Sequence, residues 1–291
     1  MIDPANSPYL VPSDGSFRVA DAPTAPPEDE RVGKKKSKKL LKEVIGEMRE
    51  LQRMLYAQDK YSLLLVFQAM DAAGKDGTVR AVMSGINPAG CEVHSFKQPS
   101  SEELDHDFLW RTAKRLPQRG RIGIFNRSYY EEVLVIKVHP NYLAGQRIPD
   151  QPPMEQLWAE RYESIADHEK HIARNGTVIL KFWLNVGRDE QKNRFLARID
   201  DPRANWKFSG GDVKERGHWD KYMAAYEDAI NATSKPWAPW YAVPADDKPT
   251  MRLTVARIVN ETLRNMNLSY PKLPADEVAE LGMWKEKLLN E

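Results

Sequence analysis

The residues whose types and spacing most directly suggest chemistry are Gly74, Lys75 and Gly77, in the stretch "QAMDAAGKDGT" (68–78). They follow the apolar run "SLLLVF" (62–67), so they occupy a turn between a predicted strand and the next helix. Glycines allow a backbone to approach an anion closely, the amides of a helix start point at it, and a lysine neutralises it. The stretch therefore predicts a phosphate-binding loop.

This loop departs from the common pattern G-x-x-x-x-G-K-[ST], because Ala69 stands at the first glycine and Asp76 at the hydroxyl position. The missing hydroxyl normally contacts Mg²⁺, and Asp71 could replace it, since a carboxylate is a good ligand for a hard cation. A glycine-rich turn with a chance lysine is the alternative reading of the pattern. Its place between a strand and a helix favours phosphate binding.

A second group of polar residues ends the predicted strand in "RIGIFNRSYYEE", where Asn126 and Arg127 follow a buried run. Ligands of open α/β sheets lie at the carboxyl ends of the strands. We therefore expect these two side chains to share one sheet edge with Asp71 and Lys75. Taken alone, an ordinary strand-to-helix turn with Asn126 as the N-cap is the simpler interpretation.

The elements that must position these residues alternate along the chain. Continuously apolar runs are typical of strands covered on both faces, and helical patterns between them indicate βαβ units. The fold class predicted is α/β, with a parallel sheet and helices on both sides. Strands are expected at 62–67, 91–96, 121–125, 178–184 and 240–244, and helices around 76–85, 100–116, 154–174, 188–199 and 211–232.

Both ends of the chain differ from this central part. Residues 1–33 are rich in proline and read as an extended arm, either disordered or draped over the main body. "KKKSKK" (34–39) then opens a helix whose apolar stripe at 41–55 could face the core or a partner. The lysine run is either a solvated helix start or a sign of a nearby negative ligand or acidic partner, because a helix start already carries partial positive charge and lysines there are unfavourable in isolation. Residues 271–291 are expected to form a tail with a short helix.

The composition excludes several classes of protein. The 291 residues are 41% hydrophobic and carry a net charge of only +1, so nucleic acid is not expected as a partner. A single cysteine excludes an internal disulfide framework and fits a reducing compartment. No run approaches the roughly 20 apolar residues of a membrane helix, and no secretory signal is recognisable. We expect a cytoplasmic protein without a membrane partner.

Beyond these patterns, five stretches resemble the second family of polyphosphate kinases. The family's loop has the form G-x-D-x-x-G-K-x-G, which Asp71, Gly74, Lys75 and Gly77 match, while Ala69 departs at the first glycine. The matching blocks run in order from about 36 to 265. They are "AMDAAGKDG", "NPAGCEVHSFKQPSSEELDHDFLWR", "FNRSYYEEVLV", "WKFSGGDVKERGHWDKY" and "APWYAVPAD".

The resemblance implies a P-loop kinase-like catalytic domain at 34–270, with three α/β/α layers, a central parallel five-stranded sheet and a helical lid at about 187–222. It implies Mg²⁺-dependent transfer of phosphoryl groups from inorganic polyphosphate to nucleotides, with Mn²⁺ able to replace Mg²⁺. Asn126 and Glu131 look like the subgroup that acts on both AMP and ADP, giving ADP and ATP. A homo-oligomer, dimer or tetramer, is expected. The alternatives are an ADP-preferring enzyme, a conventional ATP-dependent nucleotide kinase, and a sensor without turnover.

The residue roles follow from that chemistry, in which positioning and charge neutralisation matter most. The predicted catalytic residues are Asp71, Lys75, Asn126, Arg127 and Glu131, with Asp71 and Glu131 also holding the metal. The predicted phosphate ligands are Ala72, Ala73, Gly74, Asp76, Gly77 and Thr78 in the loop and Arg194, Arg198 and Lys207 in the lid. Lys97, Gln98 and Arg111 are predicted to meet the nucleotide, and Arg80, Lys114, Arg115 and Lys137 to form a polyphosphate track.

Overall fold

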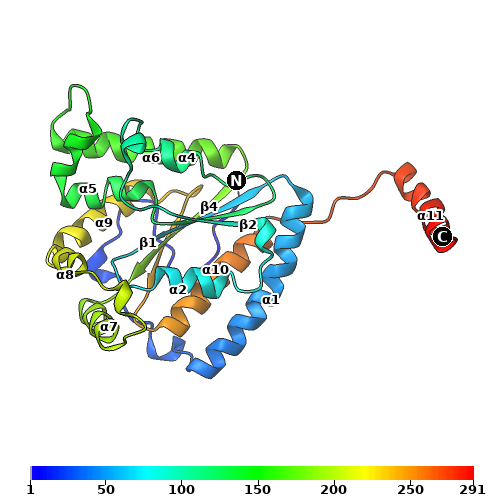
Figure 1. Cartoon of the computed structure of the whole chain (residues 1–291), viewed down its shortest axis with the longest axis horizontal. Helices are drawn as coiled ribbons and strands as arrows, with labels where there is room; N and C mark the ends of the chain where they lie inside the picture. Colours follow the sequence, from blue (N-terminus) through cyan, green and yellow to red (C-terminus); the bar gives the residue numbers. More distant parts are fainter. Residues whose placement is uncertain (1) are drawn as a thin grey trace.

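The computed structural model describes residues 2–291 and contains a five-stranded sheet in which every pairing is parallel (Figure 1). The strand order is β2-β3-β1-β4-β5. This confirms the predicted α/β fold class. The strands are β1 (Ser62–Gln68), β2 (Cys91–Ser95), β3 (Ile122–Asn126), β4 (Thr177–Asn185) and β5 (Trp240–Pro244).

Helices cover both faces of the sheet, which completes the three predicted layers (Figure 1). One face carries α1 (Lys34–Gln58), α2 (Lys75–Val82) and α10 (Lys248–Asn265), and the other carries α6 (Met154–Arg174) and α9 (Trp219–Thr233). Because helices lie on both sides, β1 and β5 are buried along their whole length. The remaining helices are α3 (Ser101–Leu104), α4 (Trp110–Ala113), α5 (Val135–Val138), α7 (Arg188–Asp200), α8 (Gly210–Arg216) and α11 (Ala275–Leu289).

Two predicted helices are broken in the structure. The segment 100–116 forms only α3 and α4, because Asp107 uses its carboxylate to accept a hydrogen bond from the Leu109 amide at 2.9 Å. Such local side-chain bonds compete with a helix. The segment 211–232 divides into α8 and α9 at Gly217 and His218, the two residues between these helices.

The N-terminal arm packs against β5, the strand at one edge of the sheet. The amide of Val11 donates to Trp240 O at 2.9 Å, and that of Ala242 donates to Tyr9 O at the same distance. Farther along, Asn185 donates to Ala22 O at 3.0 Å. The arm is thus draped over the body.

Helix α1 turns its apolar stripe inward, where Met48 and Leu55 are buried in the same core as the sheet. The opposite end of the chain behaves differently, because α11 stands away from the body and none of its side chains is buried (Figure 1). Within residues 2–291, none of the helices combines the length and apolar character needed to cross a membrane.

Candidate functional site

The phosphate loop follows β1 and bends sharply before α2. Ala72 and Gly74 have φ angles of +62° and +109°, both in the left-handed region. Lys75 folds back over the loop, and its ammonium group donates to Ala69 O at 2.6 Å. Burial, followed by repulsion from Arg127, lowers the pKa of Lys75. An anion in the loop would offset both effects, so the geometry favours binding of a phosphate here.

A charged group made of Asp71, Arg127 and Glu131 lies beside this loop. Arg127 Nη2 lies 2.9 Å from Asp71 Oδ1, and its Nη1 lies 3.3 Å from Glu131 Oε2. Arg127 itself has a φ of +64°, which turns the guanidinium back toward the loop from the end of β3. The carboxylate of Glu131 and then that of Asp71 raise the pKa of Arg127, opposed by burial. The site therefore holds a permanent cation between two carboxylates.

Asn126 joins the end of β3 to the start of α2. Its amide donates to Asp76 Oδ1 at 2.5 Å. The sheet register allows this contact, because Phe67 at the end of β1 pairs with Asn126. Asn126 and Asp76 thus act as a polar link between the two segments that carry the candidate site.

Two cavities open on the charged group. A cavity of about 220 Å³ is lined by Asp71, Arg127 and Glu131 together with Tyr222 and Tyr226 of α9. A second one, of about 440 Å³, shares Arg127 and Glu131 and extends to the nucleotide candidates, Lys97, Gln98 and Arg111. Such a space can accept an elongated ligand whose charged end lies at Arg127.

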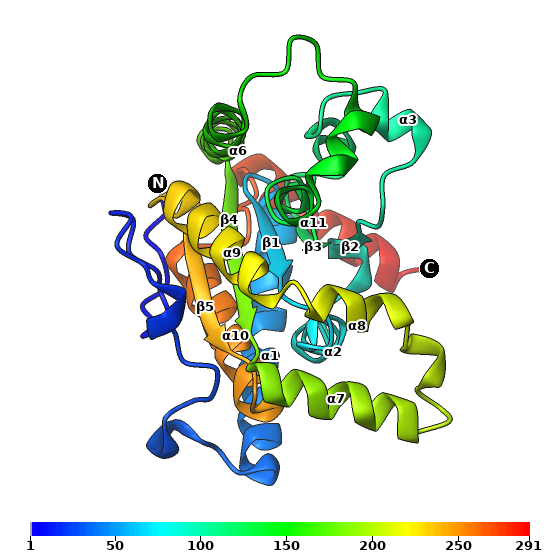
Figure 2. The ribbon, with the colours of Figure 1, turned by 90° about the vertical axis from the view of Figure 1, so that its left-hand side faces the viewer.

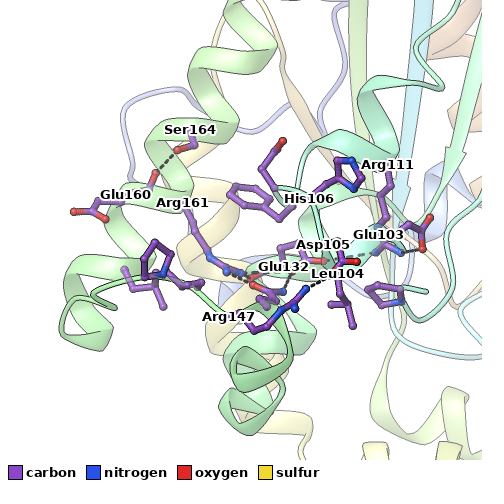
Figure 3. Close-up of a pocket in the computed structure, with 17 residues that line it drawn as sticks. Glu103, Leu104, Asp105, His106, Arg111, Glu132, Arg147, Glu160, Arg161 and Ser164 are labelled. Atoms are coloured by element: carbon purple, nitrogen blue, oxygen red, sulfur yellow. Dashed lines mark hydrogen bonds and ion pairs between the residues drawn. The ribbon is translucent and has the colours of Figure 1, made fainter. Parts of the chain in front are cut away.

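A third cavity, of about 660 Å³, lies next to the second one and shares Arg111, Glu132 and Gln146 with it (Figure 3). Here the charged side chains mostly bind one another. Glu132 accepts from Gln146 Nε2 at 2.6 Å, and the Glu132 carbonyl accepts from Arg161 Nη1 at 2.9 Å. Burial is the main cause that raises the pKa of Glu132. This network stabilises the wall of the 440 Å³ cavity, which we call the nucleotide-sized cavity.

Two of the predicted phosphate ligands have other partners in the structure. Arg194 donates from all three of its nitrogens, to the carboxylate of Glu190 and to four backbone carbonyls, of Ala72 and Ala73 in the loop and of Ala245 and Asp246 after β5. Its five N–H groups are thereby used. Thr78 is buried and donates back to Gly74 O at 3.0 Å. Both side chains thus bind the loop in this structure, and their contact with a phosphate stays a prediction.

The other predicted cations are spread over the molecule. Lys137 donates to Asp228 at 2.7 Å and to Tyr162 at 3.1 Å, and Arg198 lies 3.8 Å from Asp212. Lys114 sits over the Trp110 ring at 3.2 Å, and Lys207 over the Trp206 ring at 5.0 Å. Arg80 and Arg115 are exposed on the surface.

Several lining residues were not predicted. Tyr222 and Tyr226 are four apart on α9 and so share one face, a spacing that could have been noticed. Gln191 of α7 donates to Asp71 O at 2.9 Å and holds that residue in place. Asn141 and Tyr142 line the 440 Å³ cavity from the 3-10 helix Pro140–Gln146, for which the sequence offers no comparable signal.

The chain resembles known proteins over most of its length. Residues 31–271 match the family model described as polyphosphate kinase 2. An ADP-polyphosphate phosphotransferase of Rhodopseudomonas palustris is 52% identical over 86% of this chain and 87% of its own length. An AMP/ADP-polyphosphate phosphotransferase of Meiothermus ruber is 40% identical over 91% of this chain and 95% of its own length.

A solved structure shows the same architecture. The crystal structure of a polyphosphate kinase 2 from Arthrobacter aurescens aligns with a TM-score of 0.86 at 38% identity, over 98% of this chain and 99% of the other. The predicted P-loop kinase-like architecture is thereby confirmed. This chain belongs to the polyphosphate kinase 2 family.

Proposed function

We propose that the protein transfers a phosphoryl group from inorganic polyphosphate to AMP and to ADP, with the help of a divalent metal. The observation that carries this proposal is the position of Arg127 and Glu131, which line both the small cavity beside Asp71 and the larger cavity with Lys97, Gln98 and Arg111. A nucleotide in the larger cavity would present its terminal phosphate to the phosphate loop.

The reaction needs positioning more than covalent chemistry. An oxygen of the acceptor phosphate attacks the terminal phosphorus of the polyphosphate chain, and the bridging P–O bond breaks. The shortened chain leaves with that bridging oxygen. The second pKa of a phosphate monoester is about 6, so the acceptor is already ionised at neutral pH and needs no strong base. Lys75 and Arg127 would neutralise the charge on the group being transferred.

A divalent metal fits the carboxylates that border the small cavity. Mg²⁺ is usually held by one or two carboxylates together with substrate phosphates and water, and Asp71 and Glu131 both line this space. Within residues 2–291, no set of three or more His, Cys, Asp or Glu side chains could hold a metal. When bound, Mg²⁺ or Mn²⁺ would screen the charges of the phosphates. Asp71 and Glu131 would orient those phosphates.

The segment 187–222 is proposed as the lid that excludes water from the transfer. It lies beside α2 in both ribbon views, and Arg194 fixes its first helix to the phosphate loop (Figures 1 and 2). Arg198 and Lys207 are the lid cations that retain access to a ligand, Arg198 after release from Asp212. We propose that Arg194 holds the phosphate loop in place through its hydrogen bonds to the loop carbonyls. The cytoplasmic location and the homo-oligomer stay predictions.

A second candidate is an enzyme that prefers ADP as acceptor. The reason is that the name of the relative with 52% identity mentions ADP and not AMP. The choice depends on the acceptor. We would incubate the purified protein with Mg²⁺, polyphosphate and AMP, ADP or neither, and follow the nucleotides by chromatography. ADP and ATP formed from AMP would support the proposal, whereas product from ADP alone would favour the second candidate. Lys75→Ala is the control for contaminating kinases, and turnover with ATP but not with polyphosphate would overturn both candidates.

A further inference from the structure

Several helices begin at the same edge of the molecule as the phosphate loop. Val32, just before α1, donates from its amide to Thr250 Oγ1 of α10 at 3.4 Å. Farther along, Glu47 of α1 accepts from Asn260 of α10 at 3.0 Å, so the two helices run side by side in the same direction. The start of α10 also contacts α2, where a Cβ at Gly77 would lie 2.9 Å from Arg252 Nη2. The starts of α1, α2 and α10 are therefore neighbours.

Basic side chains lie at the starts of α1 and α10, and a further one, Arg80, lies in the last turn of α2. We define the basic surface by six cations on the three helices. Neither α1 nor α10 has an acidic residue in its first turn, where the helix dipole alone would favour one. The basic surface consists of Lys34, Lys35 and Lys36 of α1, Arg80 of α2, and Lys248 and Arg252 of α10.

These cations lack the partners that would normally balance them. Among residues 2–291, none of the six side chains makes an ion pair or a hydrogen bond with another group of the protein. The Nε atom of Arg252 is buried without a partner. Burial, followed by repulsion from Arg194 and Arg80, lowers the pKa of Arg252. Holding like charges together in this way is unfavourable unless an anion joins them.

Three acids near the starts of α7 and α10 already have partners. Asp247 accepts the Thr250 amide at 2.8 Å and caps α10, and Asp246 accepts the Gly187 amide at 2.7 Å. Glu190 is bound by Arg194 at 2.7 Å. None of these three carboxylates forms an ion pair with a cation of the basic surface, so that surface can take up an anion.

The position of the basic surface relative to the nucleotide-sized cavity indicates what that anion is. The cavity with Lys97 and Gln98 follows β2, on one side of the phosphate loop, whereas α10 follows β5 at the opposite edge of the sheet. A donor chain that enters the loop from the side away from the nucleotide passes over the starts of α2, α10 and α1. A flexible polyanion needs such a row of cations.

We propose that the basic surface binds the part of a long inorganic polyphosphate chain that extends beyond the phosphate loop, and that it thereby favours long chains over short ones. This inference rests on the proposed function. It moves the polyphosphate track away from Lys114, Arg115 and Lys137 and retains only Arg80 of the earlier set. The lysine run at the start of α1 becomes its outer end.

The test compares two triple variants that lose the same charge. The first is Lys34→Ala, Lys35→Ala and Lys36→Ala. The matched control is Lys272→Ala, Lys285→Ala and Lys287→Ala in the exposed C-terminal tail, which points away from the body (Figure 1). For each protein, kcat/KM is measured with long-chain polyphosphate and with the shortest chain that the wild type uses.

For the α1 variant we expect the ratio of long-chain to short-chain kcat/KM to fall roughly tenfold at low salt, with no change in the ratio for the tail control. The slope of log affinity against log salt for long chains should become shallower by about 2, as for three lost contacts to a single-stranded polyanion. An unchanged ratio, or the same change in the tail control, would overturn the inference. A wild type that turns over no polyphosphate would refute the proposed function instead, and binding of long-chain polyphosphate without nucleotide would still test the basic surface.

Discussion

The segment 126–132 contributes to two charged groups that differ in their surroundings. On one side, Tyr130 joins the pair of Lys181 and Glu169, both fully buried. On the other side, Arg127 joins Asp71 and Glu131, which line a cavity. We refer to them as the buried group and the cavity group.

In the buried group every donor has a partner. Lys181 Nζ donates to Glu169 Oε2 at 2.6 Å, to Thr233 O at 2.7 Å and to Tyr130 OH at 2.9 Å. Glu169 Oε1 accepts from the hydroxyls of Tyr129 and Tyr130. Burial lowers the pKa of Lys181 to about 8, although Glu169 partly offsets it. The pair of Lys181 and Glu169, whose hydrogen bonds are all satisfied within the protein, holds β4 to α6. It has no donor left for a ligand.

The cavity group is incomplete by comparison. The guanidinium of Arg127 and the carboxylate of Asp71 are about one-third exposed, at 39% and 32%. Their remaining hydrogen-bonding capacity points into space that a substrate can fill. The difference teaches that a chain can place two similar ion clusters close together in its sequence. The cavity beside Asp71, Arg127 and Glu131 is the reason that we propose this cluster as the functional one.

The largest expected effect is on the cavity group. Arg127→Ala should lower kcat/KM with polyphosphate by roughly 10²–10³-fold, because it removes a cation aimed at the transferred phosphoryl group. Its free energy of unfolding should change by less than about 1 kcal/mol, since the ion pairs are partly exposed. Steady-state kinetics and urea denaturation check both numbers. A large loss of stability would erase the distinction between the two groups, and Arg127→Lys should recover only part of the activity.

The second prediction concerns the buried group. Lys181→Met leaves the buried carboxyl of Glu169 without its cation and should cost about 3–5 kcal/mol of unfolding free energy. The fraction that remains folded should keep its kcat. Adding Glu169→Gln should restore part of the stability, because the amide no longer needs a counter-charge. A fall in kcat at unchanged stability would show that the comparison is wrong.

The smallest effect is expected at Asn126, which links the cavity group to the phosphate loop. Asn126→Asp should lower activity with AMP more than activity with ADP, by roughly tenfold in their ratio, or about 1.4 kcal/mol of transition-state stabilisation. The reason is that a carboxylate at position 126 would keep the metal and the phosphates from lying as deep in the site as the shorter AMP requires.

The control for this prediction exchanges the two partners. In Asn126→Asp with Asp76→Asn, the 2.5 Å hydrogen bond can form in the reverse direction. If the position of the charge decides the acceptor, AMP activity stays low in the double variant. Recovery of the AMP-to-ADP ratio would show that only the link matters, and equal losses with both acceptors in the single variant would sink the idea.

Much of the fold could be predicted from the sequence, because the strongest sequence signals are local. The continuously apolar run at the core of β1 predicts a strand covered on both faces, and the structure confirms it. Asn126 and Arg127 could be placed at the same edge as the loop because parallel strands end together. These arguments need only the neighbours along the chain and one rule of topology.

What could not be predicted depends on the rotation and contacts of whole elements. Arg194 and Arg198 are four apart and share a helix face, yet Arg194 is 6% exposed and Arg198 27%. Their exposure differs because the first turns of α7 pack against the phosphate loop and the segment after β5. This packing cannot be read from the spacing of the two arginines. The same holds for Arg252, which meets Gly77 only after α10 and α2 have packed.

The arm along β5 has a consequence for how the protein behaves when shortened. Its antiparallel contact at Leu10 and Tyr241 occupies backbone groups that a sheet edge would otherwise offer to another chain. Tyr241 and its neighbours are apolar and fully buried, so removing the first dozen or so residues would bare a long hydrophobic edge. By covering β5, the arm keeps this edge of the sheet from pairing with another chain.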